Sequence, residues 1–175
     1  MIDTETTPKI FLTDYGSYNE GTQFEFGHWV ELSQFDSVED YAKYEKKHFE
    51  NADKKRPLFG GIREEVMITD FEGFPREFYS ESSMDFERLF NWINASSEEQ
   101  IIMDLKLQKF GDSESTEEIH FYCGTTEDHE LFEMYYPESD ELTKNNPYLQ
   151  IDYAGFVRDC FTAYTVGENT YYVED

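Results

Sequence analysis

The feature that most constrains the fold of this chain is its excess of acidic side chains. The 175 residues include 39 Asp and Glu against 14 Lys and Arg, so the formal net charge is -25. Self-repulsion of this size opposes a compact state, and it usually accompanies disorder, adaptation to high salt or a cationic partner. The chain also carries 16 Phe, 13 Tyr and 2 Trp, whereas disordered acidic segments are poor in aromatic residues. We therefore expect a folded protein whose core is rich in rings.

The acids are unevenly distributed along the chain. Residues 1–109 hold 12 Lys and Arg against 23 acids, whereas residues 110–175 hold only Lys144 and Arg158 against 16 acids. Between Lys109 and Lys144 there are 11 acids and no Lys or Arg. Adaptation to high salt predicts acids spread evenly over a chain, so this asymmetry favours a directed acidic surface.

Residues 1–72 predict an N-terminal α+β module. Short runs of apolar and β-branched residues predict strands over 9–15, 24–32 and 65–71. Ser37 is expected to cap a helix that follows it, because acids open that segment and lysines close it, as the helix dipole favours.

Residues 73–116 predict a helical middle module. Ser82 with Asp85, and Ser96 with Glu99, have the spacing of a capping box, in which a side-chain oxygen at each position accepts a backbone N–H of the other. The apolar residues of the first helix then recur on one face of a 3.6-residue period. They are Phe86, Leu89, Phe90 and Ile93.

Residues 117–175 predict a C-terminal α+β module. A strand is expected over 118–124, followed by a helix that Thr125 or Thr126 caps. Phe132 and Tyr136 are spaced to stack on that helix at i and i+4.

Two further elements complete the C-terminal module. Pro147 is expected to open another helix that runs to about Asp159, and two β-rich runs around 167–169 predict a terminal hairpin. The fold class is therefore predicted as α+β, with three small modules in series over 1–72, 73–116 and 117–175.

No residue pattern in the chain indicates catalysis, a cofactor or a metal. The two cysteines, Cys123 and Cys160, and the nearby His120 and His129 lack the spacing of zinc ligands. No nucleophile motif or phosphate-binding glycine loop occurs, and paired carboxylates are expected by chance among so many acids. We predict that the protein is not an enzyme, although a hydrolase that uses paired carboxylates or a metal stays as an alternative.

Composition also limits the partners and the cellular location. A nucleic-acid binder needs Lys and Arg to neutralise phosphates, and this chain has the opposite sign. We see no signal peptide and no stretch of transmembrane length. The prediction is a cytoplasmic protein with reduced thiols, bound to neither nucleic acid nor membrane.

One local segment is basic. Residues 43–56 hold six Lys and Arg against three acids, a net charge of +3. These cations have two interpretations: they pair with nearby acids around a helix C-terminus, or they contact an acidic patch on a partner or a second subunit.

The acidic segment between Lys109 and Lys144 can imitate the charge of DNA. Duplex DNA carries one charge per roughly 1.7 Å of axis, so the 25 net charges of the whole chain correspond to about 42 Å, or roughly 12 base pairs, and those of a dimer to about 25 base pairs. We predict that these carboxylates stand in for phosphates in a basic groove, with no catalysis involved. The alternative is an acidic module for another basic DNA-binding protein, such as a nucleoid protein or a repressor. The candidate residues are Asp112, Glu114, Glu117, Glu118, Glu127, Asp128, Glu130, Glu133, Glu138, Asp140 and Glu141.

Four segments, taken in order, resemble the ArdA-type antirestriction proteins. KIFLTDYGSYNEG with GHWVEL is similar to the opening of that family, and EEVMITDFEGFP to the strand that leads into its central helices. MDFERLFNWI is similar to the helix that follows, and YLQIDYAGFVRDC to its C-terminal signature. The resemblance extends from about Lys9 to Val173, nearly the whole chain.

The resemblance implies an elongated, curved DNA mimic that forms a homodimer. Such a protein would occupy the DNA groove of a Type I restriction-modification enzyme, formed by its specificity and methyltransferase subunits, and would be carried by a plasmid, conjugative transposon or phage. The antirestriction motif of the family would fall near 136–152, where Tyr148 and Ile151 are possible dimer contacts. Lys144 interrupts the acidic run there, and the lysine-rich segment 43–56 is enlarged.

Overall fold

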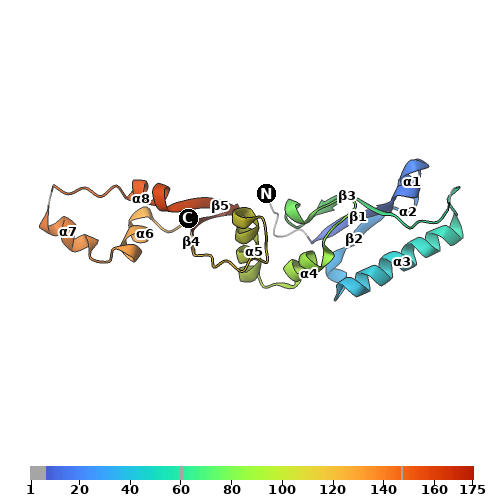
Figure 1. Cartoon of the computed structure of the whole chain (residues 1–175), viewed down its shortest axis with the longest axis horizontal. Coiled ribbons are helices and arrows are strands. Elements are labelled where there is room, and N and C mark those ends of the chain that lie inside the picture. The colour runs from blue at the N-terminus through green and yellow to red at the C-terminus, as the bar shows by residue number, and fades with distance from the viewer. Residues whose placement is uncertain (1–6, 60, 147) are drawn as a thin grey trace. The chain divides into compact units, whose positions relative to one another are not determined.

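Two three-stranded antiparallel sheets, accompanied by several helices, organise the chain in the computed structural model (Figure 1). The structure describes residues 7–59, 61–146 and 148–175. The predicted α+β class is therefore confirmed. The chain divides into two compact units, one ending at Asp104 and the other spanning Leu105–Asp175. The series of three modules stays a prediction.

The first sheet has the order β2-β1-β3. Its strands are β1 (Lys9–Asp14), β2 (His28–Glu31) and β3 (Val66–Glu72), close to three of the predicted strands. Ile10 and Leu12 of the central strand are fully buried, as expected where alternate side chains of a strand point to one face of the sheet.

The main helix of the first unit is α3 (Val38–Lys55), which begins where the sequence predicted. The hydroxyl of Ser37 accepts the backbone N–H of Asp40 at 3.2 Å, so the predicted cap is confirmed. Tyr41 is buried, and its ring lies 4.5 Å from that of Phe86, centroid to centroid. This contact packs α3 against the next long helix along the chain.

The strand predicted over 24–32 is wrong in its first half. Helix α1 (Tyr15–Asn19) and the single turn α2 (Gln23–Phe26) come before β2, and the strand begins only at His28. The transition falls at Gly27, where a Cβ atom would lie 2.3 Å from the carbonyl oxygen of Gln23. Only glycine allows the backbone to approach itself so closely there.

A buried ionic cluster joins three segments of the first unit. The Arg63 side chain is 0% exposed, and its Nη1 donates to Oδ1 of Asp53 at 2.6 Å and to the carbonyl oxygen of Arg56 at 2.8 Å. Its Nε lies 3.3 Å from Oδ2 of the equally buried Asp14 and donates to the Ser17 hydroxyl at 3.1 Å. The cluster therefore ties the C-terminal end of α3 to the end of β1 and to α1.

The first α-helices after β3 in the chain are α4 and α5. In α4 (Phe86–Asn94), Leu89 and Phe90 are buried, which confirms the predicted apolar face. The predicted cap at Ser82 is wrong, because the carboxylate of Asp85 accepts the N–H of Arg88 at 3.2 Å and the helix begins at Phe86. Asp85, which directly precedes the first residue of the helix, took the capping position.

The capping box that the sequence predicted before the next helix, α5 (Ser97–Phe110), is present. The Glu99 carboxylate accepts the backbone N–H of Ser96 at 2.8 Å, and the N–H of Glu99 donates to the Ser96 hydroxyl at 3.4 Å. The sequence located this helix start correctly because both partners lie within one turn.

A carboxylate is buried between α4 and α5. Asp104 is 4% exposed, and its Oδ1 accepts the indole N–H of Trp92 at 2.8 Å. Burial raises the pKa of Asp104 to about 6, and the nearby Glu77 acts in the same direction, against the opposing effect of the Trp92 hydrogen bond. The charged form of Asp104 therefore destabilises the folded state.

Replacing Asp104 with Asn should stabilise the protein at pH 8 by about 1 to 2 kcal/mol, since the charge is removed and the Trp92 bond is kept. Because the pKa is raised on folding, the wild-type penalty shrinks as the pH falls through about 6. The gain should therefore drop to about half at a pH of about 5. Urea unfolding of both proteins at the two pH values measures this. If the variant is less stable than the wild type at pH 8, the charged form of Asp104 stabilises the folded state and this explanation is wrong.

The second sheet has the order β4-β6-β5. Its strands are β4 (Phe121–Cys123), β5 (Phe161–Val166) and β6 (Asn169–Glu174). The predicted terminal hairpin is confirmed, with Val166 paired to Asn169 and Gly167 at a φ of 60°, a conformation that favours glycine.

The helices of the second unit are α6 (Asp128–Tyr135), α7 (Ser139–Asn145) and α8 (Tyr153–Cys160). The expected threonine cap of α6 is wrong, since its N-cap is Glu127. The helix expected from Pro147 begins at Tyr153 instead; Pro147 itself lies outside the described residues. None of the described helices is both long and apolar enough to cross a membrane.

Candidate partner-binding surface

The predicted acidic surface belongs to the second unit, whose core positions it. Leu131 of α6, Val157 of α8 and Phe161 of β5 form a buried cluster, with Tyr122 and Tyr172 packed against it. Because α6 and α8 both cover the sheet through these residues, the remaining sides of the two helices face outward.

Aromatic rings fasten α6 to α8. The Phe132 ring lies 5.0 Å from Phe156 and 5.4 Å from Tyr153, both in near-perpendicular geometry. The rings of Phe132 in α6 and of its C-cap residue Tyr136 are 4.8 Å apart, so the predicted i and i+4 ring pair is confirmed. Ring contacts of this kind contribute about 0.5 to 1.5 kcal/mol each beyond area burial, so the acidic side chains are not needed to hold the helices together.

The predicted carboxylates lie on three consecutive parts of the second unit. Four are on the loop 111–120 before β4, four are at the start of α6 or within it, and three are just before α7 or within it. All whose side chains are described are exposed, except Asp128 and Glu133, which are half-buried. The side chain of Asp140 lies outside what the structure describes. The loop members are Asp112, Glu114, Glu117 and Glu118, those of α6 are Glu127, Asp128, Glu130 and Glu133, and the others are Glu138, Asp140 and Glu141.

Most of these carboxylates keep their charge available to a partner. Glu127 lies 3.2 Å from Nδ1 of His129, and Glu118 lies 3.7 Å from Nε2 of His120. Across residues 7–59, 61–146 and 148–175, eight members of the set form no ion pair with Lys or Arg. The eight are Glu117, Glu118, Glu127, Asp128, Glu130, Glu133, Glu138 and Glu141.

Carboxylates also hold the N-termini of the two packed helices. The Glu130 side chain accepts the backbone N–H of Glu127 at 3.1 Å. At α8, Oδ1 of Asp152 accepts the N–H of Gly155 at 2.9 Å, and a Cβ at Gly155 would lie 2.5 Å from Oδ2 of Asp152. Helix N-termini favour negative charge, so the fold itself stabilises acids at these places.

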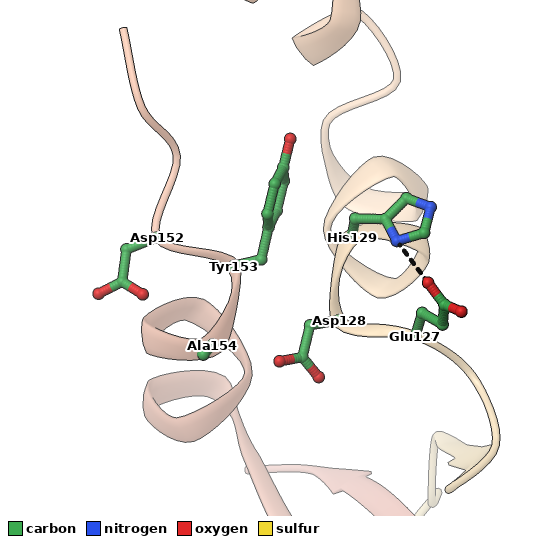
Figure 2. Close-up of a pocket in the computed structure, with 6 residues that line it drawn as sticks. All are labelled: Glu127, Asp128, His129, Asp152, Tyr153 and Ala154. Atoms are coloured by element: carbon green, nitrogen blue, oxygen red, sulfur yellow. Dashed lines mark ion pairs between the residues drawn. The ribbon is translucent and has the colours of Figure 1, made fainter.

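An open pocket lies between these two N-termini (Figure 2). The Tyr153 ring stands between the helices, 6.4 Å from the His129 ring, and His129 turns toward Glu127. Three carboxylates and an aromatic ring around an open pocket suit a lysine or arginine side chain. The pocket is lined by Glu127, Asp128, His129, Asp152, Tyr153 and Ala154.

Sequence reasoning missed Asp152 and Tyr153 as members of this surface. The signal was present, because an Asp three residues before a Gly at the start of an apolar period is typical of a helix N-cap. Because the helix was expected to start at Pro147, Asp152 was assigned to the middle of that helix and was not recognised as its N-cap.

No metal centre is formed by the residues that the structure describes. Within those ranges, no three His, Cys, Asp or Glu side chains are grouped so that they could hold a metal ion. The two possible dimer contacts differ in exposure, since the Tyr148 side chain is 98% exposed and Ile151 is half-buried.

A family model for antirestriction protein (ArdA) matches residues 10–173, nearly the entire chain. The chain belongs to the ArdA family. Membership implies an antirestriction function directed at restriction enzymes, in a family whose members are not enzymes. No curated protein and no solved structure matches the chain.

Proposed function

We propose that this protein blocks Type I restriction-modification enzymes by occupying their DNA-binding groove as a DNA mimic. The observation that carries the proposal is the stretch between Lys109 and Lys144, where 11 acids occur without a Lys or Arg. Eight of these acids form no ion pair with Lys or Arg in the described part of the chain. A groove that binds phosphates through Lys and Arg would bind such carboxylates with the same electrostatics.

In the proposed contact, the pocket between α6 and α8 binds one basic side chain of the target enzyme. Asp128 and Asp152 lie on its two sides, with the Tyr153 ring beside them (Figure 2). A guanidinium that enters it would meet carboxylates and an aromatic ring face, a combination that favours Arg over other side chains. In this proposal the target's specificity and methyltransferase subunits supply that cation, and the protein works in the cytoplasm of the cell that receives a mobile element.

The test is inhibition of purified Type I enzymes across a salt series. We expect cleavage and methylation to be inhibited most strongly at low salt, and the inhibition constant to rise steeply as salt increases, because the contact releases counterions. An uncharged crowding protein serves as control. No inhibition of any enzyme in a panel at low salt would refute the mechanism, and capture of nucleoid proteins or repressors in place of restriction subunits would favour the alternative partner.

We also propose that the protein acts as a homodimer through Tyr148 and Ile151. The Tyr148 ring is 98% exposed, so it is available to fill a pocket on a partner, as tyrosines at interfaces often do. Replacing Tyr148 with Ser should weaken dimerisation at least about tenfold, because the ring leaves the contact. Sedimentation equilibrium measures the change, with the exposed Tyr18 changed to Ser as control. Equal dimerisation of both variants and wild type would place the interface elsewhere.

A further inference from the structure

The outer side of α3 carries a row of exposed lysines, Lys43, Lys46, Lys47 and Lys54, which we term the lysine face. At 3.6 residues per turn these four fall within an arc of about 100° and extend over about 16 Å of helix. The buried residues Tyr41, Phe49 and Ala52 lie on the opposite side of the helix. The lysines therefore point into solvent along one line.

The lysine face is mostly unneutralised within its own unit. Lys43 pairs with Asp40 at 2.9 Å, but Lys46, Lys47 and Lys54 form no hydrogen bond or ion pair with any residue in 7–59, 61–146 or 148–175. Nearby Asp53 does not compensate them, because its carboxylate is bound by the buried Arg63.

Few other carboxylates near the lysine face could neutralise it, and some of these already pair with other cations. Glu25 pairs with Arg56. The remaining exposed acid within the C-terminal half of α3 is Glu50, which lies on the lysine face four residues from both Lys46 and Lys54. One carboxylate among four lysines leaves the face with an excess of positive charge. The basic segment 43–56 thus has a net charge of +3 within a chain of net charge -25.

The helix dipole explains only part of this arrangement. Lys54 lies in the last turn of α3, where a cation is stabilised by the helix C-terminus. Lys46 and Lys47 lie further from that end, and the dipole effect decays within one turn. Three unpaired cations in a row are therefore not required by the stability of the helix.

We propose that the lysine face binds the acidic segment 112–141 of a second copy of this chain. Charge complementarity supports this occupant, because the same polypeptide carries both an unpaired row of cations and a stretch of 11 acids without Lys or Arg. Glu133, Glu138 and Glu141 form no ion pair with Lys or Arg in the described part of the chain, so they can meet the unpaired Lys46, Lys47 and Lys54 of another copy.

Net repulsion between two acidic chains does not prevent this contact. At physiological ionic strength the Debye length is about 8 Å, so charges beyond the contact are largely screened while the facing groups attract. The contact joins two different surfaces, and it therefore either closes a ring or continues into an open chain of copies. It is separate from the Tyr148 contact and does not depend on the proposed function.

A charge-exchange experiment with the full chain tests the proposal. The lysine-reversed variant is K46E/K47E/K54E, and the acid-reversed variant is E133K/E138K/E141K, whose side chains take no part in the helix caps described above. Sedimentation velocity at about 150 and about 500 mM NaCl should show association of the wild type that weakens as salt rises and that is at least about tenfold weaker in each variant alone. An equimolar mixture of the two variants should associate again.

The matched control is E31K/E64K/E81K, which changes three exposed acids of the first unit by the same charge. Mixed with the lysine-reversed variant, it should not restore association. Circular dichroism and thermal unfolding establish that every variant is folded. Association of the wild type that does not respond to salt, or a mixture of lysine-reversed and acid-reversed chains that stays apart, would overturn the proposal. Binding of short duplex DNA that is lost in the lysine-reversed variant would also overturn it, in favour of nucleic acid.

Discussion

Neutralising four exposed glutamates of the acidic segment should weaken inhibition of a Type I enzyme about 100-fold at moderate salt. The four are Glu117, Glu118, Glu138 and Glu141, each changed to Gln. If each carboxylate replaces a phosphate, its loss removes at most about one released counterion, so the slope of log affinity against log salt should flatten, by up to about 0.9 for each residue. Inhibition constants from a cleavage assay at four or more salt concentrations give both quantities.

Loss of folding would not explain this loss of inhibition. The four side chains are exposed and none pairs with Lys or Arg in the described part of the chain. Removing like charges reduces self-repulsion, so the variant should be at least as stable as the wild type. Urea unfolding of both proteins verifies this before inhibition is compared.

A matched variant shows whether inhibition depends on the acidic segment 112–141 or only on the total net charge of the protein. Changing Glu31, Glu64, Glu81 and Glu87 to Gln removes the same four charges from exposed positions of the first unit. We expect this control to weaken inhibition by less than about fivefold, since these four charges are not part of the proposed contact and charges beyond a Debye length from it are largely screened. Equal losses in the two variants would mean that total charge, and not the segment 112–141, determines binding.

Replacing Arg63 with Met should destabilise the protein by about 3 to 5 kcal/mol. Arg63 is 0% exposed and bridges Asp14 and Asp53, so its loss leaves the fully buried Asp14 carboxylate without a cation. The Met side chain fills most of the space but cannot donate to the Ser17 hydroxyl or the Arg56 carbonyl oxygen. Chemical unfolding monitored by circular dichroism gives the free energy directly.

Two further variants test the cause of that loss. Arg56 also pairs with a carboxylate, that of Glu25, but on the surface, and R56M should cost less than about 1 kcal/mol. In D14N/D53N/R63M the uncompensated charges are gone, so much of the stability should return. A single R63M variant as stable as R56M would show that the buried cluster contributes nothing to the fold.

The sequence predicted those elements whose determinants are local. The capping contacts of Ser37 and of Ser96 with Glu99 occur within one helical turn, and both were located correctly. The terminal hairpin was also predicted, because its turn and both strands are adjacent in the chain. Where two capping residues compete, as Ser82 and Asp85 do before α4, pattern alone does not decide which one is used.

The sequence could not predict features that depend on distant pairing. Strand β4 pairs with β6, which comes much later in the chain, and nothing in residues 118–124 specifies that partner. Arg63 lies in a polar segment next to Glu64, so its burial against Asp14 has no local signal. The pocket likewise requires that Asp152 and Asp128 come from two helices brought together by aromatic packing.

Because ring contacts hold α6 against α8, most of the acidic side chains nearby are not needed to keep the two helices packed. Under the proposed function, a substitution among those acids alters the contact with the target enzyme while the core beneath them persists. Under that function, members of the family that keep the same ring contacts could differ in the enzymes they inhibit without any change in their fold.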